Sequence, residues 1–383
     1  MLLRHTAKRI AWRIVAALSV TVGVMLSVAC DGAAPPRPRV DVTAGALAPP
    51  PAVDAPATRV TDPRTGDHVV TRQRASMGTR VVLTAWGEDD ARIARAFDDA
   101  FAEFERIDRL MTTWTDASEV SRINAAAGSG LGVRVSSELL DVLDKALWAA
   151  KISGGAFDAT VGAFAGVWKF DEDRDGTIPP PALVEERRRL VGFADLIVDR
   201  ARGEARLVRP GQRITLGGIA KGHAVDRATA LLRSAGLVDF LVQAGGDLYV
   251  AGQRGARPWR IGIRDPRGGP DDYFALADIT DRSFSTSGDY ERYVIVDGRR
   301  YHHILDPATG YPAMRTRSVT VLAKDALTAD ALSKGLFVIG PERGLALVES
   351  VPDADAVFVG ADGKVTVSRG LTGRLTLLHP PRD

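Results

Sequence analysis

The chain has 383 residues, and 50 Lys and Arg residues against 48 Asp and Glu residues leave a formal net charge of only +2. No cluster of basic residues follows the N-terminal segment, which argues against nucleic-acid binding. The single cysteine, Cys30, excludes a disulfide within the chain. The length is sufficient for one large hydrophobic core or for two closely packed subdomains.

Residues 1–30 resemble a bacterial lipoprotein signal peptide. A basic start precedes an apolar run at 14–28 that is short for a membrane-spanning helix. The run ends in Leu-Ser-Val-Ala-Cys at 26–30, which is similar to a lipoprotein cleavage box. Cys30 would then carry a lipid and anchor the protein in a bacterial cell membrane, facing the periplasm or the cell exterior. The alternative is an uncleaved membrane anchor.

Residues 31–66 are rich in proline and alanine and show little apolar periodicity. This composition is typical of an extended tether. We therefore expect one folded domain at 67–378.

Within that domain, predicted strands and helices are mixed. Alternating apolar residues predict strands at 68–72 and 79–84, on either side of a turn at 76–79. Apolar residues at helical spacing predict a helix at 90–110. Further helices are predicted at 138–153, 224–235 and 328–337, and further strands at 240–242, 248–250, 259–263, 274–279, 293–296, 319–322, 356–359 and 364–367. Because the order lacks strict β-α-β alternation, the sequence predicts an α+β fold.

Residues 217–222, Gly-Gly-Ile-Ala-Lys-Gly, lead directly into the helix predicted at 224–235. Such a turn brings backbone N–H groups, a helix N-terminus and the Lys221 ammonium group close to a phosphate. The segment matches neither the Walker spacing nor the dinucleotide-binding fingerprint. The alternative is a tight turn with one solvated lysine.

Asp158 lies in a small, apolar turn bounded by glycines, Gly155 and Gly162. Its carboxylate could accept hydrogen bonds from the N–H groups of a ligand. It could also cap a helix that begins at Ala159, and both roles are compatible.

Residues 301–312 are predicted to be a strand followed by a turn. Asp-Pro at 306–307 and Thr-Gly at 309–310 are typical turn sequences, but they do not explain the pair His302 and His303. A histidine three residues before Asp306 could transfer a proton or hold a ligand. A zinc site is not expected, because no second pair of ligands has a matching spacing.

Residues 284–290, Phe-Ser-Thr-Ser-Gly-Asp-Tyr, are predicted to form a hydroxyl-rich turn between strands. Its hydroxyl and N–H groups would suit a phosphate or a ring carbonyl. The alternative is an ordinary hairpin connection.

Residues 171–176 are similar to the first half of a calcium-binding loop. However, Ala182 stands where the bidentate glutamate is expected, and the prolines at 179–181 argue against a helix after the loop. We predict a solvated acidic loop instead.

Eight segments, in order from about Arg74 to Gly370, resemble the ApbE-type FAD:protein FMN transferases. That family is commonly exported and lipid-anchored, which agrees with Cys30. The segments are 77–79, 111–114 with 118–124, 155–160, 216–222, 245–247, 286–290, 303–310 and 329–333.

The resemblance implies an α+β fold of two closely packed subdomains with FAD in the cleft between them and Mg²⁺ on its pyrophosphate. A threonine hydroxyl of a partner protein, often a subunit of a membrane redox complex, would attack the FMN phosphorus and release AMP. Positive charge and N–H donors would stabilise the charge that develops on the phosphate. Two alternatives remain open: an FAD pyrophosphatase, and a lipid-tethered FAD-binding protein without transferase activity.

The resemblance also implies roles for individual residues. Catalysis would depend on His303, Asp306 and Lys221, with His303 as the candidate for proton transfer. The metal ligands would be the Gly218 carbonyl, the Asp330 carboxylate and the side chain at position 334. FAD would contact Met77, Trp114, Ala156, Phe157, Asp158, Thr215, Lys221, Thr286, Ser287, His303 and Ile304.

Two positions depart from the family pattern. Thr215 stands where the family has an aspartate, so a carboxylate is missing from the flavin site. Lys334 stands where the family has a threonine that binds the metal, and a charged lysine has no lone pair for a metal. Either Lys334 points away and Mg²⁺ keeps its other ligands, or its ammonium group replaces the metal and pairs with Asp330, four residues earlier on the same helix face.

Overall fold

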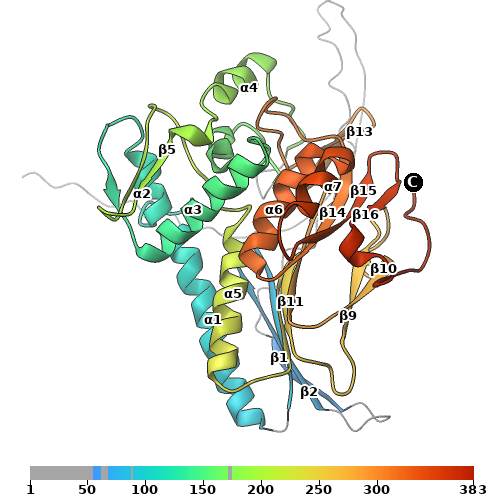
Figure 1. Ribbon diagram of the computed structural model, residues 1–383. Helices are drawn as coiled ribbons and strands as arrows, with labels where there is room; N and C mark the ends of the chain where they lie inside the picture. The colour runs from blue at the N-terminus through green and yellow to red at the C-terminus, as the bar shows by residue number, and fades with distance from the viewer. Residues whose placement is uncertain (1–54, 62–67, 88, 171–174) are drawn as a thin grey trace, which may run out of the picture. The chain divides into compact units, whose positions relative to one another are not determined.

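The computed structural model describes residues 55–61, 68–87, 89–170 and 175–383 (Figure 1). The predicted signal peptide with Cys30, the tether up to residue 54 and the acidic residues 171–174 lie outside the described residues. No helix among the described residues is long and apolar enough to cross a membrane.

A nine-stranded sheet, antiparallel throughout, is the centre of the fold. Each hydrogen-bonded pair of neighbours runs in opposite directions. The strands, in spatial order, are β1 (Ala55–Thr61), β2 (His68–Ser76), β3 (Thr79–Trp86), β7 (Phe240–Ala244), β8 (Asp247–Ala251), β11 (Arg282–Gly288), β14 (Thr316–Ala323), β15 (Asp355–Gly360) and β16 (Val365–Val367).

Helices pack on one face of this sheet. In Figure 1, α1 (Asp90–Met111) and α5 (Ala220–Ser234) lie side by side, and both contact strands of the sheet. α6 (Ala326–Ile339) packs against β11 and β14 and is buried nearly all round. The remaining helices are α2 (Glu119–Ala125), α3 (Ser137–Ile152), α4 (Pro181–Arg188) and α7 (Pro341–Glu349), with short 3-10 helices η1 (Ala159–Phe164), η2 (Phe193–Asp195) and η3 (Arg369–Leu371).

A small three-stranded sheet covers the opposite face. Its strand β10 (Tyr273–Ile279) pairs with β9 (Trp259–Arg264) on one side and with β17 (Leu375–Leu377) on the other. Apolar residues of β9 and β10, such as Ile263 and Phe274, form a common core with Leu248 and Phe284 of the large sheet. The other strands are β12 (Tyr293–Val296) with β13 (Arg299–His302), and β4 (Val133–Arg134), β6 (Glu204–Leu207) and β5 (Leu196–Asp199).

The predicted α+β class and the elements with strong apolar periodicity are confirmed. The helix predicted at 90–110 is α1, and its regularly spaced residues Phe97, Phe101 and Phe104 are fully buried. All described residues belong to one compact unit, so the two subdomains implied by the resemblance are not separate bodies.

Several boundary predictions were wrong. β1 lies inside the predicted tether and pairs with β2, so paired structure begins at Ala55 rather than at residue 67. α5 begins at Ala220, which places Lys221 in the first turn of the helix rather than before it. α4 begins at Pro181, although the prolines were expected to prevent a helix, because the first helical position needs no N–H donor.

The segment 284–290 is not the turn that the sequence predicts, since only its last two residues, 289 and 290, are in a turn. Most of this segment belongs to β11, a strand in the middle of the large sheet, between β8 and β14.

The helices α2 and α7 were not predicted at all. Ser118 caps α2 by accepting the Ser121 N–H, while α7 begins at a proline.

Candidate functional site

The start of α5 meets the N-terminal half of α6 at a close helix contact that Gly222 permits. A Cβ atom at Gly222 would lie 2.3 Å from the Ala326 carbonyl oxygen and 2.8 Å from the Asp330 Cβ. Because the side chain is absent, the Gly222 N–H can donate a hydrogen bond of 3.0 Å to Asp330 Oδ2. The Asp330 carboxylate is therefore held at the positive end of the α5 dipole.

Two lysines and two aspartates gather at this contact, and we call Lys221, Asp247, Asp330 and Lys334 the lysine–aspartate cluster. Lys221 Nζ lies 3.2 Å from Asp247 Oδ2 and 3.7 Å from Asp330 Oδ2. The Lys334 ammonium group contacts Asp330 Oδ1, one helical turn earlier on α6. The side chains of Asp247 and Asp330 are 2% and 0% exposed, while those of Lys221 and Lys334 are 20% and 19% exposed.

Attraction between opposite charges keeps Lys221 and Asp330 ionised although both side chains are largely buried. Burial would raise the pKa of Asp330, but the charges of Lys221 and Lys334 outweigh burial and keep this pKa below its usual value. Burial disfavours the charged form of Lys221, yet Asp247 and Asp330 raise the pKa of its ammonium group. The pKa of Asp247 is raised, first by burial and then by the charge of Asp330. At neutral pH the site therefore contains a protonated Lys221 beside an ionised Asp330.

Serine hydroxyls connect the cluster to β11. Ser285 Oγ donates to Asp247 Oδ1 at 2.5 Å, and Ser287 Oγ lies 2.8 Å from Ser333 Oγ of α6. Since side chains alternate along a strand, Ser285 and Ser287 share the face that α6 covers, and Thr286 points to the other face. There Thr286 Oγ1 lies 2.9 Å from Thr320 Oγ1. Of the two predicted hydroxyls, that of Ser287 is linked to the cluster through Ser333, which contacts Lys334, and that of Thr286 lies on the other face of the sheet.

His303 lies beside the cluster and carries an unpaired ring nitrogen. Its buried Nδ1 atom has no hydrogen-bond partner among the residues that the structure describes. Burial lowers the pKa of His303 well below its ordinary value, and the positive charges of Arg292 and Lys334 lower it further. The imidazole is therefore neutral at neutral pH, with one nitrogen able to accept a proton.

Arg292 brings a third positive charge to the site. Its Nη2 donates to the Gly78 carbonyl at 3.3 Å, and its own carbonyl accepts the His303 N–H at 3.1 Å. It thereby joins His303 to the turn that holds Met77, which adopts the left-handed conformation with φ of 52°. Met77 is partly buried against the main core, so its contact with a flavin stays a prediction.

Asp306 has a structural role in its turn. Its Oδ1 accepts the Ala308 N–H at 2.9 Å, and its carbonyl accepts the N–H groups of Thr309 and Gly310. Turn chemistry thus accounts for the Asp306 carboxylate, and its catalytic role is a prediction without support from these contacts. The neighbouring Ile304 is buried in the core beside α6.

Asp158 acts as the N-cap of η1. Its carboxylate accepts the N–H and the hydroxyl of Thr160 at 2.8 and 2.6 Å, and the N–H of Phe193 at 2.8 Å. The capping interpretation is confirmed, and burial raises the pKa of this carboxyl group. The Ala159 carbonyl accepts the N–H of Thr215 at 2.8 Å, which places the two predicted flavin-site positions 158 and 215 in one neighbourhood.

The other predicted FAD contacts differ in exposure. Phe157 is buried, and its ring lies 3.5 Å from the position that a Cβ atom on Gly218 would occupy. Ala156 packs against the core beside α6. Trp114 is 80% exposed, so core packing does not explain it, and a role in ligand binding stays a prediction.

The predicted metal ligands come together, but they do not fit a magnesium ion. A Cβ atom on Gly218 would lie 3.2 Å from Lys334 Cγ, so Gly218, Asp330 and Lys334 are neighbours. However, Lys334 does not point away: its ammonium group contacts the very carboxylate that would bind Mg²⁺. Across the described part of the chain, no group of three or more His, Cys, Asp or Glu side chains could hold a metal ion. Lys334 is therefore not a metal ligand, since an ammonium group has no lone pair.

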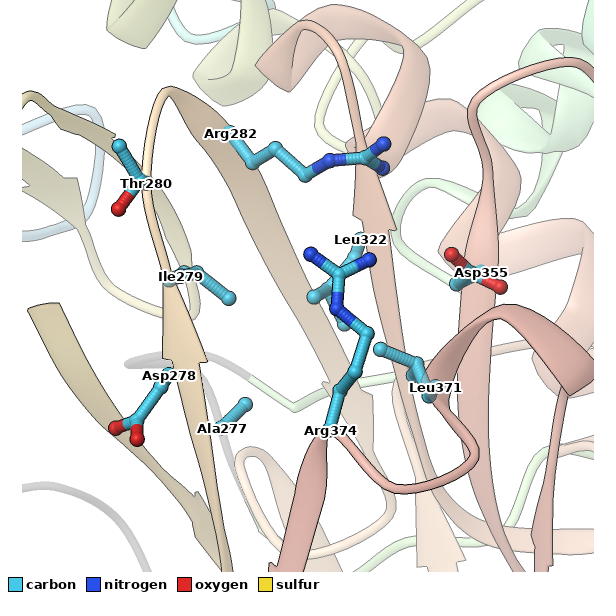
Figure 2. Close-up of a pocket in the computed structure, with 9 residues that line it drawn as sticks. All are labelled: Ala277, Asp278, Ile279, Thr280, Arg282, Leu322, Asp355, Leu371 and Arg374. Atoms are coloured by element: carbon cyan, nitrogen blue, oxygen red, sulfur yellow. The ribbon is translucent and has the colours of Figure 1, made fainter. Parts of the chain in front are cut away.

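Two hollows lie away from the cluster. Figure 2 shows a cavity of about 10 Å³ lined by residues of β10, Leu322 of β14 and the two arginines Arg282 and Arg374. An open groove of about 350 Å³ continues from Arg282 and Asp355 towards Glu349 and Arg369. The cavity is too small for a nucleotide, and no predicted site residue lines either hollow.

Together, the fold and the site define an α+β protein in which a helix N-terminus and two lysines surround two buried aspartates, with Arg292 close to Lys221. This arrangement is suited to a phosphate-containing ligand, because such ligands need N–H donors and positive charge.

Comparisons with known proteins give the family. The ApbE family matches residues 77–358. An FAD:protein FMN transferase of Treponema pallidum is 34% identical over 302 residues, which cover 75% of this chain and 83% of that relative. One of Vibrio cholerae is 36% identical over 249 residues, which cover 64% of this chain and 74% of the relative.

Solved structures agree with this result. The ApbE protein of Thermotoga maritima has a TM-score of 0.72 and 31% sequence identity, and the match covers 85% of this chain and 100% of that chain. The flavin transferase ApbE of Vibrio cholerae also has a TM-score of 0.72 and 31% identity, covering 80% and 99% of the two chains. The chain belongs to the ApbE family, as its sequence motifs predict.

Sequence reasoning assigned no role to several residues of the site. Asp247 ends the Gly-Gly-Asp segment at 245–247. This segment is one of the eight that resemble the family, but no role is predicted for its residues. Arg292 belongs to no motif, while Ser285 and Ser333 lie in the segments at 284–290 and 329–333, where neither is singled out as a site residue. The spacing of Ser285 and Ser287, two residues apart in a strand, is the signal that could have placed both on one face.

Proposed function

We propose that this chain is an FAD:protein FMN transferase, which moves FMN from FAD to a threonine hydroxyl of a partner protein and releases AMP. The observation that carries the proposal is the lysine–aspartate cluster at the start of α5, inside the segment that matches the ApbE family. The family relatives that match most of the chain are named for this activity.

The chemistry needs cations rather than a covalent intermediate. The hydroxyl oxygen of the acceptor bonds to the FMN phosphorus, the bond from that phosphorus to the bridging oxygen breaks, and AMP leaves with that oxygen. Lys221, Lys334 and Arg292 would offset the negative charge of the pyrophosphate and of the leaving AMP. We propose no step that uses a divalent metal, because the Lys334 ammonium group already pairs with the Asp330 carboxylate that would bind the metal.

His303 would take the proton of the attacking hydroxyl. Its neutral ring and its unpaired Nδ1 atom provide an acceptor beside the cationic cluster. A positioned general base of this kind contributes about 10²–10⁴-fold to a rate.

Product analysis tests the proposal. The full-length protein is incubated with FAD, with and without a soluble acceptor domain of a membrane redox-complex subunit that carries a threonine. AMP is measured by chromatography, and bound FMN by fluorescence of the denatured acceptor in a gel. AMP and labelled acceptor that appear together, only when the acceptor is present, support the transferase.

Each alternative has its own outcome. AMP formed without acceptor indicates an FAD pyrophosphatase, and bound FAD without any AMP indicates a binding protein. Lys221→Met should abolish product formation, whereas Lys324→Met, at an exposed lysine just before α6, is the matched control and should not change it.

We further propose that Cys30 is lipidated and holds the enzyme on a bacterial membrane, facing the periplasm or the cell exterior. The basic start, the apolar run and the cleavage-box-like residues 26–30 support this location. An acceptor in a membrane redox complex would then be within reach. Radioactive palmitate should label the wild-type protein in cells and leave Cys30→Ala unlabelled, and labelling of the variant would contradict the proposal.

A further inference from the structure

We propose that Lys334 is a built-in cation that replaces the divalent metal of this site, so that the chain binds its nucleotide without Mg²⁺. This inference concerns the site of the proposed function and depends on that function only where FAD is used as the probe. The residues that carry it are Lys334, Asp330, Ser333, Lys221 and Gly222.

The first argument is the geometry around Lys334. Its ammonium group contacts Asp330 Oδ1 and lies 3.1 Å from Ser333 Oγ. These contacts use two of its three N–H donors, and the side chain is still 19% exposed. The third donor can therefore reach an oxygen of a phosphate that arrives from outside.

The second argument is that both oxygens of Asp330 already have partners. Lys334 contacts Oδ1, while Oδ2 accepts the Gly222 N–H at 3.0 Å and lies 3.7 Å from Lys221 Nζ. A magnesium ion would require an oxygen ligand at 2.0–2.1 Å and an octahedral shell. To bind Asp330, it would have to displace an ammonium group that is itself positively charged.

The third argument is the charge balance. The cluster pairs two basic side chains, Lys221 and Lys334, with two acidic ones, Asp247 and Asp330, so its formal charges balance. With threonine at position 334, as the family resemblance implies, the same cluster would have one excess negative charge. A divalent cation is attracted to the second arrangement and repelled by the Lys334 charge in the first.

Metal binding can be measured independently of turnover. Mn²⁺ is titrated into the full-length wild-type protein and into Lys334→Thr, and free Mn²⁺ is followed by electron paramagnetic resonance. We expect no bound Mn²⁺ in the wild type and about one ion per chain in Lys334→Thr, because the variant restores an oxygen ligand. One bound Mn²⁺ in the wild type would overturn the proposal.

Calorimetric titration with FAD gives the second readout. In the wild type, the dissociation constant should change by less than about twofold between buffers with EDTA and with Mg²⁺, whereas in Lys334→Thr removal of the metal should weaken binding by about tenfold or more. A wild type that loses about tenfold in EDTA contradicts the inference.

If the proposed function is wrong, the titrations give a result that differs from those above. A wild type that binds no FAD in either buffer refutes the flavin site, and the Mn²⁺ titration of the nucleotide-free protein still decides the role of Lys334. If Lys334→Thr does not fold, as judged by its thermal unfolding, the wild-type measurements alone support or overturn the inference.

Discussion

The backbone N–H of Gly222 donates a 3.0 Å hydrogen bond to the carboxylate of Asp330, which joins the first turn of α5 to the N-terminal half of α6. The contact exists because the glycine brings α5 within van der Waals distance of the Ala326 carbonyl. Lys221, the preceding residue, reaches Asp247 and Asp330 from this position. The glycine thus sets the position of a charged side chain that a phosphate would meet.

Gly222→Ala should therefore damage both stability and ligand binding. Its Cβ atom would lie 2.3 Å from the Ala326 carbonyl oxygen, so the helices must separate. We expect a loss of about 1–3 kcal/mol in the free energy of unfolding, as for other overpacked cores, and weaker FAD binding by calorimetry. Gly217→Ala is the control, because its nearest neighbour would be 3.7 Å away. Equal stability of the two variants would contradict the role of the contact.

The adjacent histidines should separate function from stability. His303→Asn should lower the rate of AMP release with acceptor by about 100-fold or more, since a general base is lost, while FAD still binds. His302 Nε2 lies 2.7 Å from the Ala313 carbonyl, and its ring packs against Phe337. His302→Asn should therefore lower the melting temperature. A loss of activity in His302→Asn alone, at unchanged stability, would reverse the two assignments.

The pH profile provides a further check on His303. Its lowered pKa keeps the imidazole neutral below pH 6.5, the value of an unperturbed histidine. The acid limb of the single-turnover rate should therefore lie below pH 6.5 and vanish in His303→Asn. A limb at or above pH 6.5 would indicate a different base.

Trp114 should contribute to binding and not to folding. Its side chain is 80% exposed, so Trp114→Ala removes little packing in the free protein. Stacking of an aromatic side chain on a ring system is worth about 1–3 kcal/mol, and we expect FAD affinity to fall accordingly with an unchanged melting temperature. Leu131→Ala, which removes another exposed apolar side chain, should leave affinity unchanged.

Asp226 should make stability depend on pH. Its two oxygens accept the N–H groups of Ala326 and Leu327 at 2.7 and 2.8 Å, in the first turn of α6. Burial raises its pKa from 3.8 to about 7, so the folded state binds a proton more tightly than the unfolded chain. The protonated Asp226 carboxyl group therefore adds up to about 4 kcal/mol to the free energy of unfolding below pH 3.8. This contribution is lost as the pH rises towards 7.

Chemical denaturation of wild type and Asp226→Asn between pH 4 and 8 measures this effect. The free energy of unfolding of the wild type should fall relative to that of the variant as the pH rises, because asparagine does not titrate. Parallel curves would mean that the helix N-terminus keeps the folded carboxylate at its ordinary pKa.

The spacing of apolar residues along the chain was sufficient to predict the helices and strands that bury one face. The spacing of Phe97, Ala100 and Phe104 predicts α1, because every third or fourth residue of a helix returns to the same face. β1 could not be predicted, since its proline- and alanine-rich sequence becomes a strand only through pairing with β2. β11 was mistaken for a turn because its serines are polar, yet they are buried against Asp247 and Ser333.

The amino-acid sequence alone determined the family, the glycine–lysine segment at 217–222 and the spacing of Asp330 and Lys334, because all of these are relations between residues close along the chain. Only the tertiary structure decided which way Lys334 points and that Lys221 lies beside the carboxylates of both Asp247 and Asp330. These residues come from separate strands and helices, and their charges meet because the sheet and the α5–α6 contact bury them together. The interaction of charges depends on distance and burial, which no spacing along the chain specifies.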